Sequence, residues 1–241
     1  MSGPGPSKYK VQQASLKFAN FEPQKKYQHM ASLTAMFDPE NESAPGHYGS
    51  SQTALLLLDF HSAFIEKAGG RRAAMALQVA AKMRIWAKSR GIHIIHCLID
   101  FNATPHATCK DAQRLLSGAE TMRLGGAGEP SELLTGAEDD ATFTRKLGYV
   151  SARKSPGLDD FLRKNGIRSL ILAGLSTSGC VMRTALAATD AEYVVTAISD
   201  ACADRDEDLH DVVLGKILKN RGYVVTAVEF QEGFVEATIG R

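Results

Sequence analysis

Three residues in this sequence, Asp59, Lys146 and Cys180, could together perform nucleophilic catalysis on a small molecule. Cys180 follows a small polar turn, Gly174-Leu-Ser-Thr-Ser-Gly179, where a strand is expected to lead into a helix. A sulfur there lies near the positive end of the helix dipole and near unpaired amides, which stabilise a thiolate. A carboxylate with a suitable pKa can take the thiol proton, and a lysine can stabilise the charge that develops on the substrate.

Each of these residues also has an ordinary structural explanation. A lone cysteine is commonly a small buried side chain, an acid at a strand end commonly forms local hydrogen bonds, and most lysines are solvated. Arg145 adjoins Lys146, and Lys154 follows shortly after. The residues alone therefore leave open whether Lys146 or a neighbouring basic residue faces the other two.

Short apolar runs between polar segments predict the strands that would position these residues. A continuous run such as Thr53-Ala-Leu-Leu-Leu-Leu58 is typical of a strand buried on both faces of a parallel sheet. The predicted strands cover residues 53–58, 92–99, 169–174, 193–198 and 223–228. The predicted helices between them cover about 77–91, 158–165, 179–190 and 207–221. This alternation predicts an α/β fold: a three-layer α/β/α Rossmann-like domain with a mostly parallel, about six-stranded sheet.

The polar features gather where predicted strands end or where regular structure resumes. Asp59 ends the first strand, the turn before Cys180 follows the third, and Phe143-Thr-Arg-Lys146 follows a long segment without periodicity. Ligands of open parallel sheets bind at the carboxyl ends of the strands. We therefore expect Asp59, Lys146 and Cys180 to converge in one pocket.

The chain divides into two parts by composition. Residues 1–50 are rich in Pro, Gly, Ser, Gln and Asn with scattered aromatic residues, and they predict an irregular N-terminal arm that packs onto the body or a partner subunit. Residues 51–241 predict one domain. Within it, residues 100 to about 140 show no periodicity, and a loop of that length in a compact domain is usually functional, often a lid.

Composition excludes several classes of partner. Lys and Arg total 28 against 27 for Asp and Glu, so a net charge of +1 offers no electrostatic basis for binding nucleic acid or a membrane surface. No apolar run approaches the ~20 residues of a membrane-spanning helix, and no signal core is present. The four cysteines form no Cys-x-x-Cys pair, which predicts a reducing, cytoplasmic location.

The order of the motifs resembles the isochorismatase-like cysteine hydrolase family, which includes nicotinamidase, N-carbamoylsarcosine amidohydrolase, biuret hydrolase and ureidoacrylate amidohydrolase. The family's Gly-x-x-Thr-x-x-Cys-Val motif reads here as Gly174-Leu-Ser-Thr-Ser-Gly-Cys-Val181. The family's next strand, which ends in Asp-Ala, matches Val194-Val-Thr-Ala-Ile-Ser-Asp-Ala201 here. The resemblance runs from about Thr53 to Phe230 and leaves the N-terminal arm uncovered.

The resemblance implies a role for each matching residue. Asp59 would be the general base, Cys180 the nucleophile and Lys146 the third member of a catalytic triad. Phe64 matches an aromatic residue that flanks the substrate in many members. With His61 and Thr177, it forms the set expected to bind substrate.

Three departures separate the sequence from the family pattern. His61 stands where the family has a glutamine, which changes the expected substrate contacts. Lys146 lies five residues before Ser151 rather than the commoner four. Arg153 replaces the aromatic residue of a Ser-Ala-Phe segment, which changes the expected polarity of the pocket.

The resemblance also implies how the oxyanion would be bound. Two backbone N–H groups, those of Ser176 and Cys180, would face the developing negative charge. The family aims the first with a non-proline cis peptide bond, which falls here between Leu175 and Ser176. An uncompensated cis bond of this kind costs about 2.5–4 kcal/mol, so it persists only where the surrounding structure enforces it.

The sequence thus predicts a cysteine hydrolase that cleaves a C–N bond of a small amide or ureide through a thioester. We expect no cofactor and no metal, because Asp100, Asn102 and His106 do not match the metal-binding spacing of nicotinamidases. One alternative is vinyl ether hydrolysis of the isochorismatase type, whose members usually lack the cysteine. Others are a nucleotide-binding module, which lacks a phosphate-loop motif, and a non-catalytic binding protein. The family resemblance implies a homo-oligomer, either a dimer or a tetramer; the substrate is left open.

Overall fold

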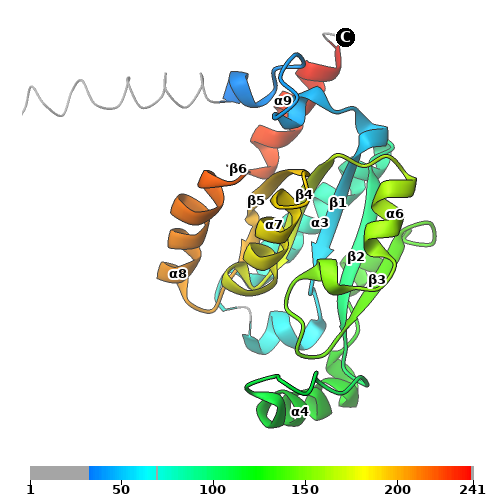
Figure 1. Ribbon diagram of the computed structural model, residues 1–241, viewed down its shortest axis with the longest axis vertical. Coiled ribbons are helices and arrows are strands. Elements are labelled where there is room, and N and C mark those ends of the chain that lie inside the picture. Colours follow the sequence, from blue (N-terminus) through cyan, green and yellow to red (C-terminus); the bar gives the residue numbers. More distant parts are fainter. Residues whose placement is uncertain (1–32, 69, 240–241) are drawn as a thin grey trace, which may run out of the picture.

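The computed structural model describes residues 33–68 and 70–239, so residues 1–32 of the predicted arm lie outside it. A six-stranded, all-parallel sheet forms the centre, with strand order β3-β2-β1-β4-β5-β6. Helices cover both faces, as Figure 1 shows. The predicted α/β/α architecture is therefore confirmed.

The strands are β1 (Thr53–Leu58), β2 (His93–Asp100), β3 (Ala141–Lys146), β4 (Ser169–Leu175), β5 (Val194–Ala203) and β6 (Tyr223–Val225). Strands β1 and β4 lie at the centre and are buried along their whole length, as their apolar runs predict. Their parallel register aligns Leu58 with Gly174, so Asp59 and the turn before Cys180 leave the sheet side by side.

One face of the sheet packs against α3 (Ala73–Ser89) and α9 (Ala227–Ile239). The other packs against α6 (Leu158–Lys164), α7 (Met182–Thr189) and the segment from α8 (Glu207–Val212) through a π-helical turn, Val213–Ile217, and a 3-10 turn, Leu218–Asn220. Side chains alternate strictly along β1: Leu55 and Leu57 enter the first core, Leu56 and Leu58 the second. This period of two determines on which face of the sheet each strand residue packs.

Two regions differ from the predictions. The segment after β2 contains α4 (Ala112–Thr121) and α5 (Ser131–Leu134), and residues 141–146 form strand β3 at the sheet edge. The two helices and the strand are all partly exposed, so their sequences lack the continuous apolar runs that marked the inner strands. The loop predicted over 100–140 is therefore only partly irregular.

The C-terminal strand prediction is too long. Strand β6 stops at Val225, and α9 begins two residues later. Thr226 and Glu229 exchange hydrogen bonds: the Glu229 carboxylate accepts from the Thr226 N–H at 2.8 Å, and the Glu229 N–H donates to the Thr226 hydroxyl at 3.3 Å. This is a capping box, Thr-x-x-Glu, that starts a helix where the Val-Val-Thr-Ala-Val pattern predicted a continuing strand.

The described part of the predicted N-terminal arm, residues 33–50, packs onto the body. Phe37 is buried, and its ring meets Phe230 of α9 edge-on at 5.7 Å between centroids. Short 3-10 turns at Pro45–His47 and Ser50–Gln52 then lead into β1. Residues 33–50 therefore belong to the packed body.

Gly174 is the tightest point between the two central strands. A Cβ atom there would lie 2.5 Å from both the Cβ and the carbonyl oxygen of Leu58. We expect Gly174→Ala to lower the free energy of unfolding by about 1–3 kcal/mol, because the backbone of β1 must shift. Gly118→Ala is the matched control, since Gly118 lies in α4 with open space around its Cα, and there alanine should stabilise by about 0.5–1 kcal/mol. Urea denaturation measures both, and equal effects of the two substitutions would contradict the steric argument.

Candidate active site

Asp59 lies directly after β1 in the left-handed backbone region, with φ of 56°. Its N–H donates to the Cys97 carbonyl of β2 at 3.0 Å, and its side chain is buried. Aspartate is one of the few residues other than glycine that adopt this conformation readily. The sharp turn points the carboxylate back over the end of the sheet instead of out to solvent.

Arg145 of β3 forms a two-pronged ion pair with Asp59. Its Nη1 donates to Oδ1 at 2.8 Å and its Nη2 to Oδ2 at 2.5 Å, while its Nε donates to the Tyr149 carbonyl at 3.0 Å. Both side chains are buried. Burial lowers the pKa of the Arg145 guanidinium, but Cys180 at the high pH where it ionises, and the charge and hydrogen bonds of Asp59, raise it by more, so its pKa stays above the usual value. Arg145 is therefore a permanent cation.

The prediction that Lys146 meets Asp59 and Cys180 is wrong. In β3 the residues alternate, so Phe143 and Arg145 turn toward the covered side while Lys146 is exposed. The basic residue beside Asp59 is Arg145, one of the alternatives that the sequence left open. A strand with a period of two cannot place both neighbours in the same site.

Cys180 lies in a π-helical turn, Thr177–Val181, that leads into α7. Only 2% of the residue is exposed, and its sulfur is 3.7 Å from the Thr184 hydroxyl. Burial, and then the charge of Asp59, raise the pKa of the thiol to about 12, against a smaller lowering by Arg145. Burial therefore favours the neutral thiol as the resting form of Cys180, against the stabilisation of a thiolate that the helix terminus was expected to give.

The structure brings Asp59, Arg145 and Cys180 together. The charge of Asp59 lies near enough to Cys180 to raise the pKa of the thiol, which favours its protonated form. The carboxylate is thus paired with a cation and lies near a nucleophile. This arrangement can move the thiol proton to Asp59 without any further group.

The Leu175–Ser176 peptide bond is cis, as predicted. After it the Ser176 carbonyl accepts hydrogen bonds from the N–H groups of Gly179 at 3.1 Å and Val181 at 3.3 Å. A Cβ at Gly179 would lie 2.5 Å from the Ser176 hydroxyl, so a larger residue there would require this hydroxyl to rotate away. The turn before Cys180 is therefore closely packed; the use of the Ser176 and Cys180 N–H groups as an oxyanion hole stays a prediction.

Two residues that the sequence analysis missed support this turn. Asp204 accepts from the Ser178 N–H at 2.7 Å, and His210 Nδ1 lies 2.8 Å from the Thr177 hydroxyl. Thr177 is fully buried, so its hydroxyl is engaged with His210. Asp204 could have been predicted, because it lies just after β5 at the carboxyl edge of the sheet. Nothing in the local sequence indicates a role for His210.

His61 has both ring nitrogens hydrogen-bonded to backbone. Its Nδ1 donates to the Ala127 carbonyl at 2.6 Å, and its Nε2 accepts from the Ile99 N–H at 3.1 Å. Burial lowers its pKa, which keeps the ring neutral. His61 therefore attaches residues 126–130, here called the covering loop, to the segment after Asp59. Its contact with substrate stays a prediction, as does that of Phe64, whose ring packs edge-on against His61 at 5.2 Å.

The covering loop has further attachments. The Ser62 N–H donates to the Gly128 carbonyl at 2.8 Å, and Glu129 pairs with His96 of β2 at 2.8 Å. His96 also lies 3.4 Å from Asp140, whose carboxylate pairs with Arg84 and Lys88 of α3. A buried charged network therefore holds the loop to the sheet beside the Asp59 turn.

The described residues offer neither a metal site nor a membrane-spanning helix. Across residues 33–68 and 70–239, no cluster of three or more His, Cys, Asp or Glu side chains has a geometry that could hold a metal ion. In the same part of the chain, no helix combines the length and apolar character needed to cross a membrane.

Comparison with known proteins decides the family. The model of the isochorismatase domain matches residues 53–229, which is most of the chain. The chain belongs to the isochorismatase family. It is therefore a hydrolase, and the predicted resemblance is confirmed.

Individual relatives agree with this family. The chain is 26% identical over 180 residues to maleamate amidohydrolase of Pseudomonas putida, covering 72% of this chain and 82% of that one. Its fold is similar to a cysteine hydrolase from Pseudomonas syringae pv. phaseolicola, with a TM-score of 0.65, 20% identity, and coverage of 79% and 95%. It is also similar to N-carbamoylsarcosine amidase from Thermoplasma acidophilum, with a TM-score of 0.56, 20% identity, and coverage of 73% and 96%.

Replacement of the two adjacent basic residues separates their roles. Arg145→Met should lower the free energy of unfolding by about 3–5 kcal/mol, because it leaves the Asp59 carboxylate buried without its partner. Lys146→Met should change it by less than about 0.5 kcal/mol, because the side chain is exposed. Urea denaturation near pH 7 measures both. If Lys146→Met proved the more damaging, the ion pair described above would be incorrect.

The ionisation of Cys180 can be measured directly. With a thiol pKa of about 12, the sulfur stays protonated at pH 8, and thiolate should form only as the pH approaches that value. The absorbance difference at 240 nm between the native protein and Cys180→Ser should therefore be close to zero at pH 8. A full thiolate signal at pH 7 would show that the helix terminus and Arg145 outweigh burial.

Proposed function

We propose that this hydrolase cleaves the C–N bond of a small amide or ureide through a thioester on Cys180. The observation that carries the proposal is one buried carboxylate, Asp59, that is paired with the Arg145 guanidinium and lies near enough to the Cys180 thiol to raise its pKa. The relatives named maleamate amidohydrolase and N-carbamoylsarcosine amidase support amide chemistry.

In the first half of the reaction, Asp59 takes the thiol proton as the sulfur attacks the carbonyl carbon of the substrate. The carbonyl oxygen becomes an oxyanion, which the N–H groups of Ser176 and Cys180 are proposed to bind. The protonated Asp59 then gives its proton to the leaving nitrogen as the C–N bond breaks. Ammonia or an amine leaves, and the acyl group remains on sulfur as a thioester.

In the second half, Asp59 takes a proton from water as the water oxygen attacks the thioester carbon. The second tetrahedral intermediate collapses, the C–S bond breaks, and Asp59 returns the proton to sulfur. The acid product leaves and the thiol is restored. The carboxylate thus acts as base and acid twice, and atoms and charge balance at each step.

Arg145 holds the Asp59 carboxylate differently from the lysine that the resemblance implied. A lysine holds a carboxylate through one movable ammonium group, whereas the arginine fork engages both oxygens of Asp59. This orients the carboxylate firmly. Because the thiol pKa is near 12, we expect the proton to move as the carbon–sulfur bond forms.

Because Cys180 and Asp59 are buried, we propose that the covering loop moves to admit the substrate. Its attachments to His61, Ser62 and His96 are hydrogen bonds. A cover held by polar contacts can open and close again, and when closed it excludes water that would weaken the charges at the site.

Ammonia release from a panel of small amides and ureides tests the function. We expect activity on at least one compound, and Cys180→Ala should reduce it by on the order of 10³-fold or more, because no other group forms the thioester. Cys109→Ala is the matched control: Cys109 lies outside the site and is only partly exposed, so activity should be unchanged.

Mass spectrometry after rapid acid quench should show the acyl group on Cys180 of the native protein. Activity that survives in Cys180→Ala would contradict the thioester. Turnover of vinyl ether substrates by that variant would instead support the isochorismatase-type alternative.

A further inference from the structure

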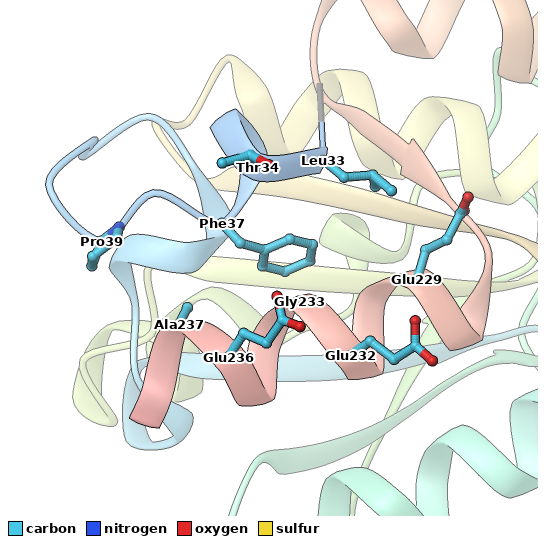
Figure 2. Close-up of a pocket in the computed structure, with 9 residues that line it drawn as sticks. All are labelled: Leu33, Thr34, Phe37, Pro39, Glu229, Glu232, Gly233, Glu236 and Ala237. Carbon is cyan, nitrogen blue, oxygen red and sulfur yellow. The ribbon is translucent and has the colours of Figure 1, made fainter. Parts of the chain in front are cut away.

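A groove lies away from the active site, between α9 and the first described residues of the chain. It encloses about 480 Å³ and is lined by Leu33 and Phe37 on one side and by Glu229, Glu232 and Glu236 of α9 on the other. Figure 2 shows the phenyl ring of Phe37 above the helix and the carboxylates of Glu232 and Glu236 projecting from it.

The floor of the groove is apolar and closely packed. The Phe37 ring lies so near Gly233 that a Cβ there would be 2.1 Å from it, and it also packs edge-on against Phe230. Phe230 in turn contacts Trp86 of α3. The floor is therefore continuous with the core, and it can support an aromatic side chain laid on top of it.

The rim of the groove is acidic. Helix α9 contains three glutamates and no basic residue. Glu232 and Glu236 are exposed, stand four residues apart on one face, and form no ion pair within the described chain. Like charges at this spacing, with one of them near the helix C-terminus, weaken a helix by a few tenths of a kcal/mol. A cation bound here would remove that cost.

The preceding part of this chain has the matching chemistry. Residues 1–32 contain five lysines and one acid, and residues 17–27 combine Lys17, Lys25 and Lys26 with the aromatic residues Phe18, Phe21 and Tyr27. The described chain begins at Leu33, which itself lines the groove. From there Lys26 has a reach of roughly 23–25 Å, which is ample for a groove along one helix.

We propose that residues 17–32 bind in the α9 groove of the same chain. Lys25 and Lys26 pair with Glu232 and Glu236, and an aromatic residue of the segment covers the floor formed by Phe37. The groove thus serves as an intramolecular docking surface, and the segment holds the C-terminal helix against the sheet.

Hydrogen exchange of the full chain, followed by mass spectrometry, tests the proposal. Amides of residues 17–32 should exchange at least about tenfold more slowly than a free peptide of that sequence. Glu232→Lys/Glu236→Lys should remove most of this protection, and adding Lys25→Glu/Lys26→Glu should restore it, because the charges are then exchanged and not lost. Salt at 1 M should weaken the protection, since the screening length falls to about 3 Å.

Glu120→Lys/Glu138→Lys is the matched control. It reverses the charge of two exposed glutamates outside α9, so it should leave residues 17–32 protected. Exchange of β1 and β4 amides confirms that each variant is folded. The proposal would be overturned if residues 17–32 of the native chain exchanged as fast as the free peptide. It would also be overturned if Glu232→Lys/Glu236→Lys left their protection unchanged. Protection that rises with protein concentration would place the segment on a second copy and overturn docking within one chain.

Discussion

The buried ion pair between Asp59 and Arg145 constrains the architecture around the site. A carboxylate removed from water at the end of β1 requires a fixed cation, and the guanidinium reaches it from β3, two strands away in the sheet. The pair therefore ties the sheet edge to its centre. It also fixes the register of β3, because a shift by one residue would turn Arg145 outward and bring Lys146 in.

The same desolvation sets the chemistry. Burial of Cys180, and then the charge of Asp59, raise the pKa of the thiol, which favours the protonated sulfur. The sequence argument considered the helix terminus, which favours the thiolate, and did not include burial, which opposes it more strongly. A helix dipole contributes about 0.3–1 kcal/mol at an exposed site, whereas full burial shifts a pKa by several units. Position along the chain suggested a reactive cysteine, but burial determines its resting state.

Several features away from the reacting groups position them. Asp204 and His210 hold the turn before Cys180, while His61 and His96 hold the covering loop. Each links segments far apart in the sequence. At the opposite side of the described fold, the capping box at Thr226 starts the helix whose acidic face forms the α9 groove.

The sequence alone determined the approximate extents of the inner strands, the layers of the fold, and the positions of Asp59 and Cys180 at strand ends. These follow from local apolar runs and short motifs, which need no knowledge of distant contacts. The family and the cis Leu175–Ser176 bond followed from the resemblance of those motifs to known proteins. Only the tertiary structure decided between Arg145 and Lys146, because strand β3 is a half-exposed edge strand and its phase depends on pairing with β2. It also decided the thiol state of Cys180 and the partners of His61, since burial and long-range hydrogen bonds are properties of the assembled fold, not of any one segment.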